Sequence, residues 1–142
     1  MKKVLLLLIV ILLVSCKDEV VSPNKVKTAE LNKPFELKIG ESVSLEMGKV
    51  NFTFESVPAD SRCPTGAICR WAGDATVVIK FSEEFRDSLH TNVGQSGLVV
   101  DAYNINLISL SPYPKASEQI NEAAYIAKFE VNKVILGKKG NK

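Results

Sequence analysis

Residues 35–55 decide the fold class, and they read Phe35-Glu36-Leu37-Lys38-Ile39-Gly40-Glu41-Ser42-Val43-Ser44-Leu45-Glu46-Met47-Gly48-Lys49-Val50-Asn51-Phe52-Thr53-Phe54-Glu55. Apolar side chains occupy every second position in three short runs. Gly40-Glu41 and Gly48-Lys49 separate the runs. Alternation with period two is typical of strands with one buried face, and the glycine pairs indicate tight turns. This stretch therefore predicts consecutive antiparallel strands, with Met47 among the buried positions.

The same alternation recurs further along the chain. It places Val77, Ile79 and Phe81 on one face, then Tyr103, Ile105 and Leu107, and finally Tyr125, Ala127, Phe129 and Val131. The phase slips at Ile108 and Leu110, which indicates a β-bulge or burial on both faces. Residues 115–124 follow two prolines and are compatible with a helix or with a loop. We predict an all-β domain over residues 34–136, either an antiparallel, immunoglobulin-like β-sandwich or a small barrel, with about seven strands.

The N-terminus has the features of a secretory signal. Lys2 and Lys3 precede an apolar run over residues 4–14, which is shorter than the roughly 20 residues that a membrane-spanning helix needs. The end of the run, Leu13-Val14-Ser15-Cys16, resembles the lipobox of bacterial lipoproteins. That resemblance implies cleavage after Ser15, transfer of diacylglycerol to the Cys16 thiol and acylation of the new amine. The alternative is an ordinary signal peptide that contains a cysteine.

Residues 16–33 are polar and contain little periodicity, so we predict a flexible tether between lipid and domain. The segment Lys17-Asp18-Glu19 resembles the signal that sends some lipoproteins of Gram-negative bacteria to the outer face of the outer membrane. Its simpler interpretation is a solvated, charged linker. We therefore expect the protein in the cell envelope, anchored by its lipid in the outer membrane. The domain would lie either on the cell surface or on the periplasmic side.

Charge argues against nucleic acid as a partner. The chain has 18 basic and 16 acidic residues, and cleavage after Ser15 removes two lysines and no acid. A mature chain with 16 of each sign offers no electrostatic drive toward phosphate. The basic residues at 137–142 are interpreted as a disordered tail. The 127 residues that remain after cleavage suit one domain with one core.

Cys63 and Cys69 remain as a pair when Cys16 carries lipid. In an oxidising compartment we expect them to form a disulfide, with Pro64 and Gly66 turning the short loop between them. Free thiols and a zinc site are the alternatives. Zinc needs about four ligands, and His90 is the one histidine that this chain adds to the pair.

Residues 60–74 are the most distinctive segment, and they join two expected strands. The run Asp60-Ser61-Arg62-Cys63-Pro64, followed by Cys69-Arg70-Trp71-Ala72-Gly73, resembles a segment of small, uncharacterised secreted proteins and lipoproteins of bacteria. That resemblance extends over about residues 35–134 and implies a fold but no activity.

Two roles are open for this segment. The segment could be a structural corner. Asp60 would then accept hydrogen bonds from backbone amides in an Asx turn, Trp71 would cover the end of the sandwich, and Gly73 would allow a tight return into the strand. As a binding loop, Arg62, Arg70 and Trp71 would clamp an anionic or sugar ligand, because guanidinium forks and aromatic faces suit such groups. Asp60, Arg62, Arg70 and Trp71 are the candidate binding residues.

Catalysis is not expected. His90 lies in Asp87-Ser88-Leu89-His90, but neighbours in sequence do not make a triad, and on a strand Asp87 points away from Ser88 and His90. No phosphate loop, His-Glu-x-x-His motif or nucleophile elbow is present, so no catalytic residue, metal or cofactor is assigned. Three hypotheses remain: a lipid-anchored protein that binds a protein or small ligand or acts as an accessory subunit, a protease-inhibitor-like module that presents residues 60–74, and a weak enzyme centred on His90.

Overall fold

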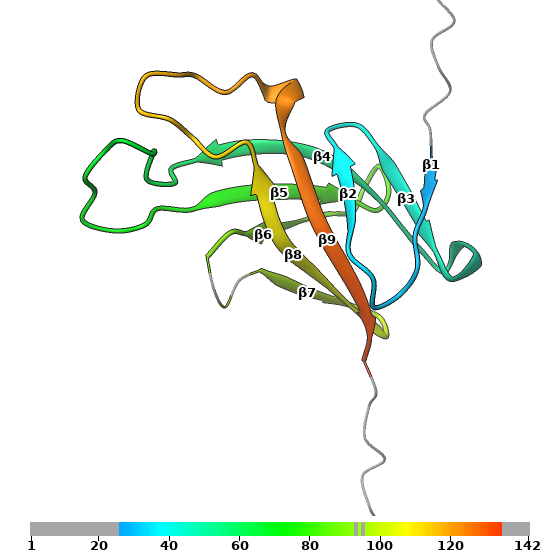
Figure 1. Ribbon diagram of the computed structural model, residues 1–142. Helices are drawn as coiled ribbons and strands as arrows, with labels where there is room; N and C mark the ends of the chain where they lie inside the picture. Colours follow the sequence, from blue (N-terminus) through cyan, green and yellow to red (C-terminus); the bar gives the residue numbers. More distant parts are fainter. Residues whose placement is uncertain (1–25, 93, 95, 135–142) are drawn as a thin grey trace, which may run out of the picture.

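The protein is a two-layered β structure in a computed structural model that describes residues 26–92, 94 and 96–134 (Figure 1). Within these residues the strands are β1 (Val26–Thr28), β2 (Phe35–Lys38), β3 (Ser42–Leu45), β4 (Val50–Asp60), β5 (Ala75–Lys80), β6 (Arg86–His90), β7 (Gly97–Val100), β8 (Tyr103–Ser111) and β9 (Ile126–Lys133). Two 3-10 helices, η1 (Glu46–Gly48) and η2 (Glu122–Ala124), connect some of them. The predicted signal peptide, Cys16, Lys17-Asp18-Glu19 and the tail 137–142 lie outside the described residues.

The strands form two sheets. One sheet has the order β1-β3-β4-β5-β6 and the other the order β2-β9-β8-β7. Neighbouring strands are antiparallel except β1, which pairs with β3 in parallel. The sheets do not close on each other, so the β-sandwich is confirmed and the small barrel is wrong.

The core lies between the sheets and follows the predicted alternation. The inward positions of β5, β8, β9 and the first half of β4 carry apolar side chains, and these side chains are almost fully shielded from water. Phe52 of one sheet meets Phe129 of the other edge to face, with ring centroids 5.4 Å apart. Aromatic pairs of this geometry add stability beyond the area they bury. The registers that the sequence pattern predicts are therefore fixed by contacts between the two layers.

The phase slip in β8 is a β-bulge. The pairing of β8 with β9 shifts between Leu107 and Ser109, so Ile108 is the extra residue and its side chain is half exposed. Beyond the bulge the alternation resumes with Leu110 buried. One of the two predicted explanations, a bulge, is confirmed. Its effect is to turn Ile108 outward beside the loop that joins β4 to β5.

The strand count differs from the expected seven because three strands are too short or too polar to show a clear period. β1 is only three residues long, Val26-Lys27-Thr28, and β6 has a mostly polar sequence, Arg-Asp-Ser-Leu-His. β7 starts with a glycine, which favours turns. Met47 is also a correction: β3 ends at Leu45, and Glu46 and Met47 both have positive φ angles, which leaves the Met47 side chain fully exposed.

The predicted tether ends earlier than expected. Residues 26–33 were assigned to it, but β1 lies there and pairs with β3, and Leu31 packs partly against the core. Pairing with an existing edge supplies hydrogen bonds that a polar sequence can use without a hydrophobic period. The folded domain therefore includes β1, which begins at Val26. Residues 115–124 are mostly loop, with η2 as their one helical turn.

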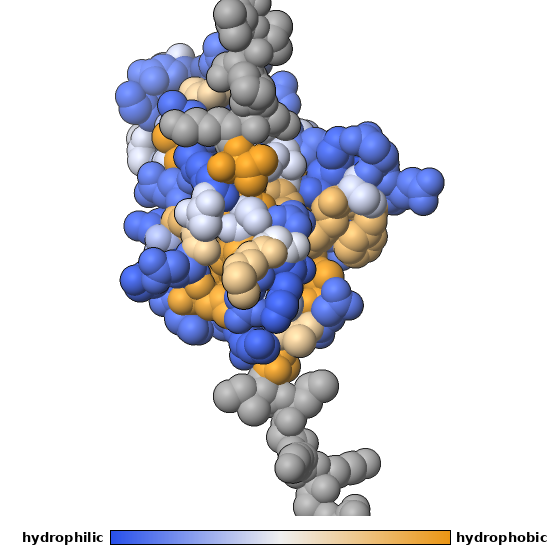
Figure 2. Space-filling model, turned by 90° about the vertical axis from the view of Figure 1, so that its right-hand side faces the viewer, coloured by the Kyte–Doolittle hydropathy of each residue, from blue (hydrophilic) through white to orange (hydrophobic). Residues whose placement is uncertain are grey.

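The surface is mixed rather than broadly apolar. Figure 2 shows the side of the sandwich on which β1 and β3 lie, where hydrophobic areas alternate with hydrophilic ones. Within the described residues no helix has the length and apolar character needed to cross a bilayer. The exposed large apolar side chains are single residues, and two of them, Ile68 and Trp71, share the β4–β5 loop.

Candidate functional site

The β4–β5 loop, residues 61–74, extends from one end of the sandwich beside the loop that joins β8 to η2 (Figure 1). Its first residues continue the hairpin: the Ser61 amide donates to the Asp74 carbonyl and the Cys63 amide to the Ala72 carbonyl, both at 2.7 Å. Gly73, at φ 72°, lies so close to Ser61 that a Cβ would stand 1.8 Å from the Ser61 carbonyl oxygen. Glycine is therefore required here, in the role that the sequence predicted.

Arg62 fixes the base of the loop. Its side chain is only 6% exposed, and it forms a fork with Asp60 in which Nε donates to Oδ1 at 2.8 Å and Nη2 to Oδ2 at 2.6 Å. The remaining donors reach across to the other sheet, to the carbonyls of Leu110 at 2.6 Å and Pro112 at 2.9 Å. A rigid guanidinium can satisfy a carboxylate and two carbonyls at once, which a lysine cannot. Arg62 is thus a cross-link between β4 and the end of β8.

Asp60 is the acceptor at the centre of this cluster. Its Oδ1 accepts the Arg62 amide at 3.2 Å, which is the predicted Asx turn, and its Oδ2 accepts the Tyr125 hydroxyl at 2.9 Å. Burial alone would raise the pKa of the Asp60 carboxyl, but the hydrogen bonds from Arg62 and Tyr125 outweigh it and lower the pKa. Burial and the bond to Asp60 raise the pKa of Tyr125 to about 12. The ion pair is therefore formed over the whole physiological pH range.

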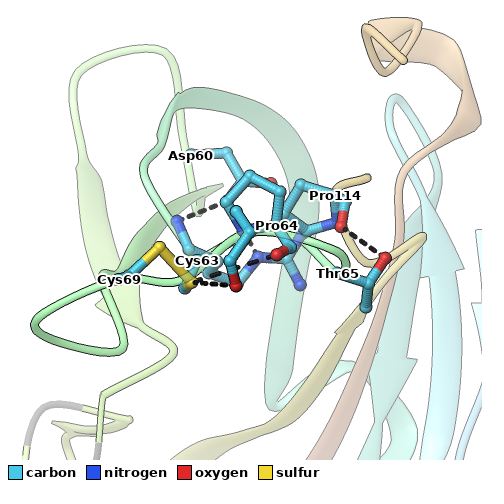
Figure 3. The surroundings of a disulfide bond; sticks show 8 residues. Asp60, Cys63, Pro64, Thr65, Cys69 and Pro114 are labelled. Atoms are coloured by element: carbon cyan, nitrogen blue, oxygen red, sulfur yellow. Dashed lines mark hydrogen bonds and ion pairs between the residues drawn. A yellow bond between two sulfur atoms is a disulfide. The ribbon is translucent and has the colours of Figure 1, made fainter. Parts of the chain in front are cut away.

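The disulfide closes the outer half of the loop (Figure 3). Cys63 and Cys69 are bonded, with their Cα atoms 6.0 Å apart, so the predicted pair is confirmed and a zinc site that uses these two thiols is excluded. Next to it, Thr65 is held on the β8–η2 loop: its amide donates to the Pro114 carbonyl at 2.9 Å and its hydroxyl at 3.3 Å. In Figure 3 the disulfide and the Thr65–Pro114 contact lie on opposite sides of Pro64. The loop is thus fixed by the Asp60–Arg62 ion pair at its base, by the Thr65–Pro114 hydrogen bonds along one side and by its own disulfide.

The tip of the loop carries unpartnered side chains. Ile68 is fully exposed, Trp71 is 76% exposed, and Arg70 is exposed and forms no ion pair within the described part of the chain. The expectation that Trp71 covers the end of the sandwich is wrong, because its indole is mostly exposed, and Arg62 and Tyr125 are the side chains that close that end around Asp60. The four candidate residues therefore separate into two pairs. Asp60 and Arg62 hold the loop, whereas Arg70 and Trp71 face solvent.

A hollow of about 260 Å³ adjoins the loop between its return arm and the bulged part of β8. Its walls include Gly73 of the loop and the half-exposed side chains of Ile108 and Tyr113. The Arg62 guanidinium forms part of the floor, 5.0 Å from the centroid of the Tyr113 ring. The remaining lining residues are Ala72, Thr91, Asn92, Leu107, Ser109 and Leu110. The loop contributes to the hollow through Ala72 and Gly73, whereas Ile68 and Trp71 of the tip do not line it.

His90 is a second anchor of the loop. Its Nδ1 lies 2.6 Å from Oδ2 of Asp74, whose Oδ1 accepts the Thr91 hydroxyl at 2.9 Å and the Asn92 amide at 3.0 Å. Partial burial alone would raise the pKa of Asp74, but these hydrogen bonds outweigh it and lower the pKa. The acid that faces His90 is therefore Asp74, at the far end of the loop, and not Asp87 of its own strand. His90 is half-buried, where a more exposed side chain was expected.

Comparison with known proteins finds no match to a model of a protein family, to a curated protein or to a solved structure. The resemblances at residues 13–16 and 60–74 therefore remain predictions. Sequence reasoning predicted the disulfide, which the structure contains, whereas the choice of this loop as the binding site stays a prediction. It missed the distant partners of the cluster: Arg62 donates to the carbonyls of Leu110 and Pro112, which leave no signal in the side-chain sequence, and Tyr125, which donates to Asp60, lies far along the chain. It also missed the contact between His90 and Asp74, for which an acid directly before a strand gives no specific signal.

Proposed function

We propose that the protein is a lipid-anchored protein of the cell envelope, without enzymatic activity, that binds a protein partner through the tip of its β4–β5 loop. The observation that carries the proposal is the contrast within that loop. Its base is fixed by a buried ion pair, a disulfide and backbone bonds, whereas Ile68 and Trp71 project into water. A rigid loop loses little conformational entropy on binding, and tryptophan and arginine are enriched among the residues that dominate interfaces.

The hollow beside the loop favours a protein over a small ligand. Its volume of about 260 Å³ lies just below the range of pockets that hold small molecules, and its wall carries two half-exposed apolar side chains, Ile108 and Tyr113. Together these side chains form a surface that a complementary protein can cover. The neutral charge balance of the mature chain gives no reason to expect an anionic polymer.

Crosslinking in intact cells tests the loop directly. A photoreactive amino acid at position 68 or 71 should yield a discrete adduct, and Trp71→Ala should reduce the adduct formed from position 68. Position 47 is the matched control, because Met47 is also fully exposed and lies in the turn before β4, whereas the loop follows β4. If all three positions give the same pattern of adducts, or if the loop positions give none, the loop is not the binding surface.

The anchor and its location are tested separately. Cys16→Ser should move the protein from the membrane fraction to the soluble fraction, and retention in the membrane would refute lipidation. Residues 17–25 separate Cys16 from β1 and span at most about 30 Å, so the domain would stay close to the bilayer. Protease treatment of intact and lysed cells then distinguishes the outer face, as Lys17-Asp18-Glu19 suggests, from the periplasmic side.

A protease-inhibitor-like role is the second candidate. A loop fixed at its base and closed by a disulfide, with Arg70 exposed near its tip, has the features of a segment that occupies a protease cleft without yielding to cleavage. Arg70 would suit a protease that cuts after basic residues. A panel of trypsin-like proteases tests this role: inhibition by the wild type and its loss in Arg70→Ala support it, and no inhibition by the wild type rejects it.

A further inference from the structure

A second concave surface lies at the opposite end of the sandwich from the β4–β5 loop. The start of β4, the turn between β5 and β6, and the turn between β7 and β8 surround it, toward the right-hand side of Figure 1. This cleft has a volume of about 460 Å³, within the range of pockets that hold small molecules. It is lined by Lys49, Val50, Asn51, Phe81 and Phe85 from the five-stranded sheet and by Val100, Asp101 and Tyr103 from the four-stranded sheet.

The walls of the cleft are aromatic and held in place. Phe81 and Phe85 stack with ring centroids 5.1 Å apart, and Phe85 is 45% exposed although its ring is apolar. On the other wall the Tyr103 hydroxyl donates to Glu46 at 2.5 Å, and Lys133 Nζ lies 5.8 Å from the centroid of the Tyr103 ring. Rings fixed in this way provide an apolar slot whose shape does not depend on a ligand.

Opposite charges stand on the two sides of this slot. Lys49 precedes β4 on one sheet, and its Nζ has only a distant contact at 4.0 Å with Glu46. Asp101 lies in the β7–β8 turn of the other sheet and forms no ion pair or side-chain hydrogen bond within the described residues. Ion pairs elsewhere on the surface are much closer, for example 2.6 Å between Lys27 and Glu41. The cleft thus offers one available cation and one available anion beside an apolar slot.

We propose that this cleft binds a free α-amino acid with an apolar or aromatic side chain. The carboxylate of the ligand would face Lys49, its ammonium group would face Asp101, and its side chain would lie between the phenylalanine pair and Tyr103. Charge complementarity favours this class, because an α-amino acid can pair with both exposed groups at once, whereas a fatty acid would use only Lys49 and a simple amine only Asp101. The site is separate from the loop and does not rest on the function proposed for it.

Binding of L-phenylalanine to the purified full chain in detergent tests the assignment. Saturation-transfer NMR and calorimetric titration should show saturable binding. Three control probes each lack one group of the ligand: glycine lacks the side chain, 3-phenylpropionate lacks the ammonium group, and phenethylamine lacks the carboxylate. Each should bind roughly tenfold more weakly or not at all. If neither L-phenylalanine nor L-leucine binds, the proposal is overturned. Equal binding of one of the three control probes overturns the assignment of the group that this probe lacks.

Three substitutions locate the site. Phe85→Ala should abolish binding, and it removes a ring that is already half exposed. Asp101→Asn and Lys49→Met should each weaken L-phenylalanine roughly tenfold; asparagine tolerates the positive φ of position 101 (φ 53°), so the turn is preserved. Trp71→Ala should leave binding unchanged, which separates this site from the loop. Unaltered affinity in Phe85→Ala and Asp101→Asn, with unaltered unfolding temperatures, would refute the cleft as the binding site.

Discussion

Replacing Arg62 by methionine should cost about 3 kcal/mol of unfolding free energy. The substitution keeps an unbranched apolar stem but removes the guanidinium and with it the bonds to the Asp60 carboxylate and to the carbonyls of Leu110 and Pro112. Breaking a buried ion pair from one side typically costs 3–5 kcal/mol, since the other charge stays buried without its partner. The lower part of that range applies here, because the adjoining hollow lets water reach the groups that Arg62 leaves.

This cost is measurable by urea and thermal unfolding of the mature chain. For a domain of this size it corresponds to a decrease in Tm of roughly 12 °C. Arg70→Met is the matched control on the same loop, and because Arg70 is exposed its effect should stay within about 0.5 kcal/mol. If the two variants lose the same amount, Arg62 does not hold the fold. Arg62→Lys should also be destabilised, because an ammonium group cannot reproduce the fork.

The pH dependence provides an independent check of the same ion pair. The pKa of Asp60 is lowered in the folded protein, so folding favours the ionised carboxylate. The resulting stability is fully present above the unfolded pKa, near 3.8, and is lost as the pH falls through the folded value. The penalty of Arg62→Met should therefore shrink below about pH 4. A penalty that is constant down to pH 2 would show that packing, not charge, explains the loss.

Three other predictions follow from the same structure. Because the pKa of Tyr125 is raised to about 12 from 10.0, stability should fall between pH 10 and 12 by up to about 1.4 kcal/mol per pH unit, and Tyr125→Phe should lose that part of the slope in alkaline unfolding curves. Gly73→Ala should destabilise the domain by well over 2 kcal/mol, or prevent folding, whereas Gly66→Ala, at φ 87° with open space around its Cβ, should cost only about 1 kcal/mol in the same assay. Reduction, or replacement of Cys63 and Cys69 by serine, should cost roughly 2 kcal/mol in urea titrations without unfolding the domain, and complete loss of the fold would contradict the view that the core is formed by the sheets.

The sequence was sufficient for the fold class because burial on one face leaves a direct pattern in β-strands. The inward residues of β5, β9 and the first half of β4 alternate without error, and even the bulge at Ile108 was visible as a change of phase. β1, β6 and β7 were not predictable in the same way, because their pairing depends on backbone bonds to neighbouring strands. Met47 shows the limit of the pattern: it keeps the period, but the chain leaves the sheet one residue after Leu45.

The candidate loop was partly predictable for a similar reason. Cysteine spacing, the turn residues and Asp60 act over short distances, so they could be interpreted from the chain alone. The burial of Arg62 could not, since it depends on backbone carbonyls at the end of β8. The exposure of Trp71 could not either, because the local sequence does not distinguish a buried indole from an exposed one. A charged residue in the interior and an aromatic one in water reverse the usual preference.

β1 determines how a mechanical load on the N-terminus would enter the domain. It has three residues, and it pairs in parallel with β3. Lys27 extends this connection, because its Nζ donates to the Glu36 carbonyl on β2 at 3.1 Å and to Glu41 at 2.6 Å. A pull on the chain before Val26 would therefore be shared between the edges of both sheets. If Cys16 is held in a bilayer, a force that pulls the domain away from the membrane would act first on the β1–β3 pairing and on the contacts of Lys27.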